Sequence, residues 1–240
     1  MTKYANILIS LIKKADKVNK KEIDKISSLI VDTIKNDGII YMFGCGHSLI
    51  SAEDCFYRAG GLANTQPIFV PELMLNISAS NSSKLEKNEK NAYTVFDGYN
   101  ISKNDLLFVF SVSGINGVPV EVAKMGKEKG LKVIGMGSSS YENEKSRHSS
   151  NKHLKDYCDY FIDNLVPKGD SVLEMNDGRK AIPVSTAICS FLIQNCFYNA
   201  FIKCEKENID VPFFSSGNLL ENKKKNEEIA NKFKQRIKHL

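Results

Sequence analysis

Gly44-Cys45-Gly46-His47-Ser48 lies between an apolar run, Gly38–Phe43, and a segment with a helical pattern, Leu49–Arg58. A strand, a glycine turn and a helix in this order leave backbone N–H groups free at the helix N-terminus, where a phosphate can bind. One short glycine turn is weak evidence for such a site. It predicts a strand–turn–helix unit, and it points to an anion site only if a second feature supports it.

A second turn of the same kind supplies that support, at Ser111-Val112-Ser113-Gly114-Ile115-Asn116. It follows an apolar strand, Leu106–Phe110, and precedes a helix expected over Val118–Lys129. A continuously apolar strand is typical of the centre of a parallel sheet. Because both turns carry hydroxyl groups at strand ends of one sheet, they predict a single anionic ligand held between them.

The composition is that of a globular protein. The chain has 240 residues, of which 42% are hydrophobic and 25% are charged, so it can bury a substantial core. No stretch approaches the roughly 18 apolar residues that span a bilayer. The apolar run Ile7–Ile12 is short and leads into Lys13-Lys14 and further helical pattern, without a small-residue cleavage site. We therefore expect a cytoplasmic protein with no membrane partner.

The formal net charge of +5 raises the question of nucleic-acid binding. The densest basic run, Lys223–Lys225, is interleaved with Glu221, Glu227 and Glu228. Mixed charges at this spacing are typical of a solvated helix face. We therefore expect no nucleic-acid partner.

The six cysteines form no CxxC pair, and they stand at positions 45, 55, 158, 189, 196 and 204. This distribution indicates reduced and mostly buried thiols. Cys45 lies within the first turn, where it is either a nucleophile or a small residue tolerated in a tight turn, and the second interpretation is favoured. No cluster has metal-ligand spacing and no dinucleotide fingerprint is complete, so we expect neither a metal nor a redox cofactor.

The hydrophobic pattern predicts one domain over residues 1–240. It divides into N-terminal helices at 1–37, a sheet core at 38–165, and a C-terminal loop and helices at 166–240. Strands alternate with helices, which favours an α/β fold: a three-layer αβα sandwich around a five-stranded parallel, flavodoxin-like sheet. The expected strands are 38–43, 67–70, 106–110, 132–136 and 160–163, and the expected helices are 2–36 (one or two), 49–58, 118–129, 185–203 and 219–237. The polar segment 76–91 is expected at the surface.

The order strand, C-G-H-S, helix, strand, S-V-S-G-I-N, helix resembles the sugar isomerase (SIS) domain of phosphosugar isomerases and phosphosugar-binding regulators. The resemblance covers about residues 38–165 and extends through the helix at 185–203. In detail the chain is similar to stand-alone SIS proteins often labelled phosphoheptose isomerases. The runs that carry this similarity are Phe43–Ser48, Ala52–Gly61 and Ser146–Ser150.

The resemblance implies that Ser48 and the pair Ser111 and Ser113 hold a phosphate. Hydroxyl groups both donate and accept hydrogen bonds, and helix dipoles supply positive potential without a bulky cation. The alternative is that Ser48 is an N-cap and Ser113 a turn residue. One departure from the family pattern is Asn116, which stands where threonine is usual and replaces a hydroxyl with an amide. The expected phosphate-binding residues are Gly46, His47, Ser48, Ser111, Ser113, Gly114 and Asn116.

By resemblance, the reaction moves a proton between C1 and C2 of a sugar phosphate through an enediol, which needs a general base and a partner acid. In phosphoheptose isomerases a glutamate on the first helix has one of these roles. Glu53 and Asp54 are both candidates here, but successive helical residues point about 100° apart, so at most one faces the ligand. We favour Glu53 as the catalytic carboxylate. The alternative is an ordinary solvated carboxylate.

The second catalytic role falls, in that family, to a histidine on the helix after the last strand. The expected helix 185–203 contains neither histidine nor glutamate. Replacement candidates are His148 and His153 after the fourth strand and Glu174 after the fifth, and His148 is favoured because imidazole titrates near neutrality. The alternative is a solvated polar loop.

The leading functional hypothesis is therefore an aldose–ketose isomerase that acts on a sugar phosphate without a cofactor. One alternative is an etherase or deaminating isomerase acting on an amino-sugar phosphate. Another is a phosphosugar sensor that binds without chemistry, because the expected base is missing from helix 185–203. By analogy with SIS proteins whose sites are completed by a neighbouring subunit, we expect a homodimer or a higher homo-oligomer.

Overall fold

The computed structural model describes residues 1–240 and contains one five-stranded parallel sheet with the strand order β2-β1-β3-β4-β5. The central strands β1 and β3 pair in register, with Ile40 opposite Leu106 and Gly44 opposite Phe110. Their carboxyl ends therefore lie side by side. The strands are β1 (Ile40–Gly44), β2 (Thr65–Pro67), β3 (Leu106–Phe110), β4 (Lys132–Gly137) and β5 (Tyr160–Asp163). This confirms the predicted sheet, although β2 lies earlier in the chain than the expected 67–70 and shares only Pro67 with it.

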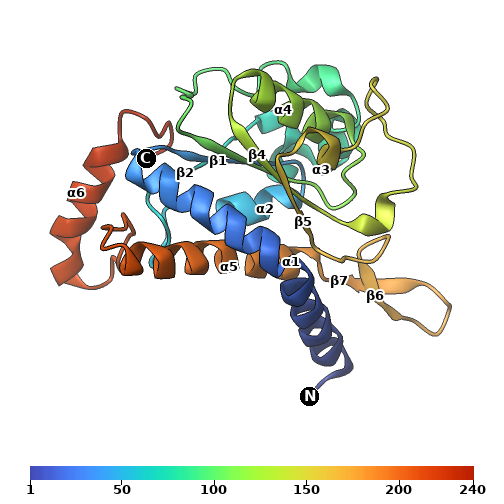
Figure 1. Ribbon diagram of the computed structural model, residues 1–240. Coiled ribbons are helices and arrows are strands. Elements are labelled where there is room, and N and C mark those ends of the chain that lie inside the picture. Colours follow the sequence, from blue (N-terminus) through green and yellow to red (C-terminus); the bar gives the residue numbers. More distant parts are fainter.

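Helices cover both faces of the sheet, as Figure 1 shows. Alternate residues of each strand point to opposite faces. Ile40 and Phe108 enter the core beneath α1 (Lys3–Lys35), α2 (Ser48–Glu53) and α5 (Ser185–Lys206). Tyr41 and Val109 enter the second core, beneath α4 (Gly117–Glu128) and α6 (Lys223–Phe233). The predicted three-layer sandwich is therefore confirmed.

A single helix, α1, occupies the region in which one or two helices were expected. Its second half packs on α5, and its first turns project beyond the body of the molecule (Figure 1). Asn19 anchors it to the edge strand, because its side-chain amide donates to the Asp163 carbonyl over 2.7 Å and accepts from the Asp163 N–H over 2.9 Å. A polar residue buried in this helix thereby satisfies the exposed edge of β5.

Three further regions differ from the predicted elements, besides β2 and the helix after β1, which ends at Glu53 rather than at 58. Residues 76–91 were expected as polar surface, but a helix, α3 (Leu75–Leu85), forms there, and its buried Ser82 donates to the Leu73 carbonyl over 2.7 Å. An unpredicted hairpin of β6 (Ser171–Glu174) and β7 (Lys180–Pro183) precedes α5. The C-terminal helix is shorter than the expected 219–237. Short 3₁₀ helices complete the chain: η1 (Pro71–Leu73), η2 (Glu89–Ala92), η3 (Ser139–Tyr141), η4 (Leu154–Tyr157) and η5 (Leu220–Asn222).

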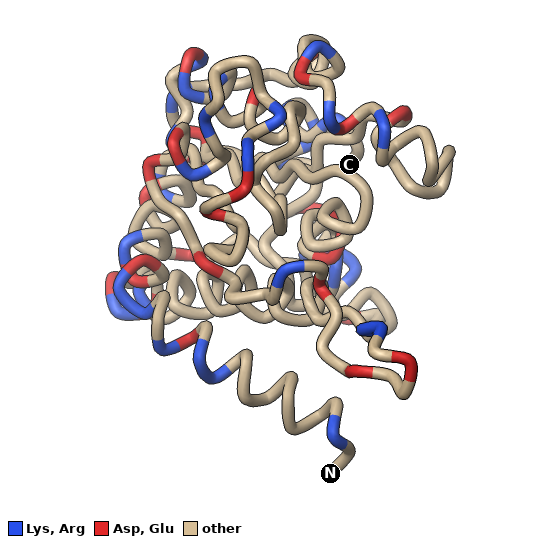
Figure 2. Tube along the Cα trace, turned by 90° about the vertical axis from the view of Figure 1, so that its right-hand side faces the viewer, with Lys and Arg blue, Asp and Glu red and all other residues tan.

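The charged residues are mixed over the surface. Figure 2 shows basic and acidic residues interspersed on the face that it presents. Many of them pair locally, for example Lys25 with Glu22 at 2.8 Å and Lys155 with Glu142 at 2.7 Å. None of the helices has the length and apolar character needed to cross a bilayer.

Candidate functional site

A cavity of about 350 Å³ opens beside the carboxyl ends of β1 and β3. Ligands of open parallel sheets bind at this edge, where the order of the strands reverses. The two turns that the sequence singled out both contribute to its wall. The lining residues are Cys45, Gly46, His47, Ser48, Leu75, Ser82, Ser83, Glu86, Ser111, Val112, Ser113, Asn116, Tyr141, Gly169, Asp170 and Ser185.

The turn after β1 is tightly packed against the helix that follows it. A Cβ atom on Gly44 would lie 2.6 Å from the Ser48 carbonyl, so no larger residue fits there. Gly46 has a φ of +56°, which favours glycine, and its N–H donates to the Leu73 carbonyl over 3.2 Å. The turn thus presents the exposed His47 ring and the Ser48 hydroxyl to the cavity. Because α2 has only six residues, shorter than expected, its dipole contributes little.

The turn after β3 carries a run of unpaired backbone donors. Gly114 has a φ of +62°, and its N–H donates to the Ser111 hydroxyl over 3.2 Å. No hydrogen bond within the chain engages the N–H groups of residues 113, 115, 116 and 117. Ile115 and Asn116 are buried, and an orphaned buried N–H is costly unless a ligand or water accepts it. Consecutive N–H groups around a left-handed residue are a recurrent anion-binding arrangement.

Asn116 connects this turn to two charged side chains. The Arg147 guanidinium donates to its side-chain oxygen, and the Asn116 side chain acts to lower the pKa of the nearby Glu86 carboxyl. Asn116 was expected only as a phosphate-binding amide in place of a hydroxyl. It lines the cavity together with Glu86.

Glu86 is the carboxylate that the sequence did not single out. It follows α3 and lines the cavity, and its backbone carbonyl accepts from the Val118 N–H over 3.0 Å. Burial raises the pKa of Glu86, and the nearby charges of Lys87 and Arg147, with the hydrogen bond from Asn116, act in the opposite direction. A partly buried carboxyl with a raised pKa is suited to accept and return a proton near neutrality.

The far wall of the cavity is built at the start of α5. Asp170 accepts hydrogen bonds from the N–H groups of Val184 and Ser185 at 3.0 and 2.9 Å, and from the Ser185 hydroxyl at 2.6 Å. Tyr141 accepts from the Gly169 N–H over 2.9 Å. Its own O–H proton is therefore available to a ligand.

Cys45 lies at the cavity but does not have the properties of a nucleophile. Burial raises the pKa of its thiol well above the ordinary value, and the charge of Glu86 adds to the effect. The thiolate is the nucleophilic form of cysteine, and it is disfavoured here. The burial of this thiol supports the interpretation of Cys45 as a small residue in a tight turn.

The residues expected to catalyse the reaction lie away from the cavity wall. Glu53 ends α2 with its side chain exposed. His148 is buried, and both of its ring nitrogens are engaged, by Glu121 and Ser150. His153 bonds to the Glu144 carbonyl over 2.9 Å, and Glu174 is exposed on the hairpin. The cavity in this chain is thus built without these four side chains.

The structure brings together the residues expected to bind phosphate, with one exception. Gly46, His47 and Ser48 lie on the cavity wall with the residues of the second turn. Gly114 shapes that turn and borders an adjoining small cavity. Glu86 and Tyr141 were missed, because each reaches the site from a segment whose course the sequence pattern does not predict. The segment 167–170, which contains Asp170, was expected beside the sugar pocket by resemblance.

Comparisons with known proteins agree with this architecture. Residues 3–138 match the SIS domain family. A UPF0309 protein of Listeria innocua is 38% identical over 236 residues, which cover 98% of this chain and 96% of the relative. A UPF0309 protein of Thermoanaerobacter pseudethanolicus is 35% identical over 246 residues, which cover 100% of both chains. The solved phosphoheptose isomerase of Neisseria gonorrhoeae is similar in fold, with a TM-score of 0.52 at 16% identity over 83% of this chain and 94% of that one.

Proposed function

Since the chain belongs to the SIS domain family, we propose that it binds a sugar phosphate in the cavity between β1 and β3 and interconverts its aldose and ketose forms. The phosphate lies against the two turns, in contact with Gly46, His47 and Ser48 and with residues 111–116. The sugar extends toward Glu86 and Asp170.

The observation that carries this proposal is the set of unpaired N–H donors at residues 113, 115, 116 and 117. These donors bond to no acceptor in the chain, and they lead into a helix of twelve residues, α4, whose dipole favours a negative charge. The Ser111 and Ser113 hydroxyls stand beside them. Together these groups supply what a phosphate needs without a lysine or arginine on the wall of the cavity.

The rest of the cavity supports a sugar as the remainder of the ligand. Its volume is at the lower end of the range typical of small-molecule sites, which is about 300–1,000 Å³. Its wall is mostly polar, with serine hydroxyls, a tyrosine and two carboxylates. These groups match the alternating donors and acceptors of a hydroxylated chain.

In this proposal Glu86 is the general base. It removes the proton from C2 of the aldose, the electron pair of that C–H bond forms the C1–C2 double bond, and O1 takes up a proton to give the enediol. Loss of the O2 proton then reforms a carbonyl group at C2, while the protonated Glu86 returns its proton to C1. His47 and Tyr141 line the same cavity and are the groups that can exchange protons with O1 and O2.

The alternative is binding without chemistry. It is favoured by one observation: α5 contributes only Ser185 to the cavity, so a base on that helix is absent.

An etherase or deaminating isomerase acting on an amino-sugar phosphate would use the same anion site.

Deuterium exchange separates these functions. The protein is incubated with a panel of sugar phosphates in D2O, and deuterium at C2 is measured by mass spectrometry or NMR. We expect exchange with at least one sugar phosphate that also stabilises the protein thermally. A ligand at 100 times its Kd adds about 2.7 kcal/mol of stability. Tight binding without exchange would contradict the isomerase and favour the sensor.

A further inference from the structure

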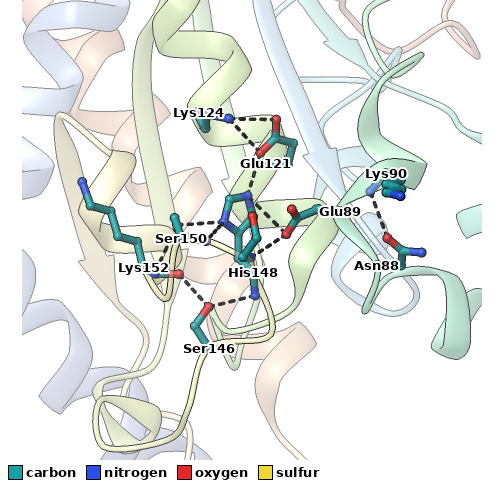
Figure 3. A network of polar contacts seen from close by, with 10 residues as sticks. Asn88, Glu89, Lys90, Glu121, Lys124, Ser146, His148, Ser150 and Lys152 are labelled. Atoms are coloured by element: carbon teal, nitrogen blue, oxygen red, sulfur yellow. Dashed lines mark hydrogen bonds and ion pairs between the residues drawn. The ribbon is translucent and has the colours of Figure 1, made fainter.

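A buried histidine lies at the centre of a polar cluster next to the cavity but outside it (Figure 3). The Nε2 atom of His148 is 2.6 Å from the Glu121 carboxylate of α4 and 3.7 Å from the Glu89 carboxylate of η2. The side chains of His148 and Glu121 are only 2% and 8% exposed. The cluster thus joins three segments: α4, η2 and the loop that contains His148.

The hydrogen bonds identify the tautomer of this histidine. The Ser150 backbone N–H can only donate, and it donates to His148 Nδ1 over 3.1 Å. Nδ1 therefore carries no proton in this arrangement, and Nε2 carries the proton that is donated to Glu121. The Ser150 hydroxyl, 2.8 Å from Nδ1, is held in turn by the Lys152 N–H over 3.2 Å. His148 is a neutral bridge between the loop and α4.

Each segment joined by the cluster lies close to a residue of the candidate site. The residue preceding His148 is Arg147, which donates to the side-chain oxygen of Asn116. Asn116 is the N-cap residue of α4 and lines the cavity together with Glu86. Glu89 lies three residues after Glu86 and accepts from the Ser149 N–H over 2.7 Å. A displacement of the loop from α4 would therefore move Arg147 away from Asn116.

We propose that His148 is a positioning residue: through its bond to Glu121 it fixes Arg147 against Asn116, and so holds the guanidinium in place beside Glu86. The inference rests on the proposed function only in giving Glu86 a catalytic task. The contacts on which the inference depends all lie within the chain and require no bound ligand.

The charges around Glu86 and His148 determine the direction in which the pKa of Glu86 should change. Arg147 and Lys87 are the cations that act on Glu86. His148 is faced by Glu121 and Lys124 of α4, by Glu89 of η2, by Lys152 of its own loop and by the Tyr157 ring of η4. The Arg147 backbone N–H donates to the Ile115 carbonyl over 2.8 Å, so we expect loss of the bond to Glu121 to displace the Arg147 side chain rather than the whole loop. Without the guanidinium at Asn116, the ionised form of Glu86 loses support. The pKa of Glu86 must then rise.

A matched pair of variants tests this directly. His148→Asn keeps an acceptor for the Ser150 N–H but is too short to reach Glu121, whereas His148→Gln keeps a side-chain N–H for Glu121. The pKa of Glu86 is measured by NMR in protein labelled with ¹³C at the glutamate carboxyls, with Glu86→Gln to assign the signal. We expect His148→Asn and Arg147→Met each to raise it by about 1 pH unit, and His148→Gln to stay close to the wild type.

Two controls separate positioning from general destabilisation. Lys155→Ala breaks an exposed ion pair with Glu142 in the same loop and should leave the Glu86 titration unchanged. The double variant Arg147→Met, His148→Asn should shift no further than Arg147→Met alone, because both changes act through the same contact. If the asparagine variant does not fold, Glu121→Ala removes the same hydrogen bond from the side of α4.

The titration of Glu86 decides the inference without any turnover. An unchanged pKa of Glu86 in folded His148→Asn, or a shift that adds fully to that of Arg147→Met, would overturn it. Where wild-type exchange is observed, the acidic limb of its pH profile should move to higher pH in His148→Asn. If no sugar phosphate undergoes exchange, the proposed function fails while the NMR result still stands.

Discussion

The Val118 N–H donates to the backbone carbonyl of Glu86 over 3.0 Å, and this one contact anchors the segment that carries the carboxylate to the first turn of α4. Gly117 makes the approach possible, since a Cβ atom there would lie 2.6 Å from the Glu89 nitrogen. The segment of the proposed base is therefore joined directly to the turn that carries the donors proposed for the phosphate. Substitution of the proposed base should lower the exchange rate, whereas substitution of a phosphate-binding group should raise the Kd.

Glu86→Gln should abolish exchange while leaving ligand binding largely intact. The amide keeps the size of the side chain but cannot accept a proton from carbon, and loss of a positioned general base costs about 10²–10⁴-fold in rate. Deuterium incorporation at C2 gives the rate, and calorimetric titration with the same sugar phosphate gives the Kd. Exchange at more than a tenth of the wild-type rate would assign the base elsewhere.

Glu53→Gln is the companion measurement, because Glu53 is the carboxylate that resemblance favoured. Its side chain is exposed at the end of α2 and does not line the cavity. The exchange rate should stay within about twofold of the wild type, as expected for a surface substitution. A loss comparable to that of Glu86→Gln would restore the assignment made from the sequence.

Ser113→Ala should weaken phosphate binding without destabilising the protein. The Ser113 hydroxyl lines the cavity and makes no hydrogen bond within the chain, so its removal costs nothing in the free protein. A hydrogen bond to a charged group contributes about 1.5–3 kcal/mol, which corresponds to at least a tenfold rise in Kd. Ser10→Ala, on an exposed part of α1, is the matched control and should change neither Kd nor Tm.

Much of the fold follows from local patterns that tertiary contacts reinforce. The strand Leu106–Phe110 was predicted with its observed bounds, because a central parallel strand is apolar at every position. Helix α5 was located by its apolar length. The hairpin β6–β7 was missed because none of its strand residues is buried, so no alternation of apolar and polar positions marks it. Helix α3 was missed because its serines and asparagines have weak helix propensity.

Part of the candidate site likewise follows from local patterns, and the rest depends on tertiary contacts. The two glycine turns are local motifs, and their meeting at one sheet edge follows from parallel pairing of β1 and β3. No local sequence pattern marks Glu86 as a site residue. Its place at the cavity depends on a hydrogen bond from the N–H of Val118, which is remote in sequence. His148 illustrates the converse: its imidazole is chemically suited to catalysis, but it is buried against Glu121 and does not line the cavity.

Asp159→Asn should lower stability in a pH-dependent way. Burial acts to raise the pKa of Asp159, but hydrogen bonds from Lys127 and the Val133 N–H and the charge of Lys132 outweigh it and hold the pKa below the ordinary value of 3.8. A lowered folded pKa gives stability that is present above the unfolded pKa and is lost as the pH falls through the folded pKa. We expect a loss of about 1 kcal/mol at pH 7, shrinking below pH 3.8, by urea unfolding. A loss that is equal at pH 7 and pH 2.5 would exclude the charge as its cause.

Asp170→Ala should destabilise the protein far more than Asp170→Asn, because Asp170 caps α5 from outside the helix. The hairpin β6–β7 lies between Asp170 and Ser185, and its antiparallel pairing returns the chain so that the carboxylate meets the N–H groups of residues 184 and 185. Loss of an N-cap costs about 1–2 kcal/mol. Asp170 also has a φ of +58°, a conformation that asparagine tolerates and that costs alanine about 1–2 kcal/mol.

Thermal unfolding of the two variants measures this difference. For a chain of this size each kcal/mol corresponds to about 2–4 °C in Tm. Asparagine retains an oxygen for both N–H groups, so its Tm should lie within a few degrees of the wild type, and alanine should fall by about 5–10 °C. Equal losses in the two variants would mean that the charge of Asp170, and not its cap geometry, stabilises α5. In that case the loss should diminish at high salt, because screening weakens charge–dipole interactions at a helix end.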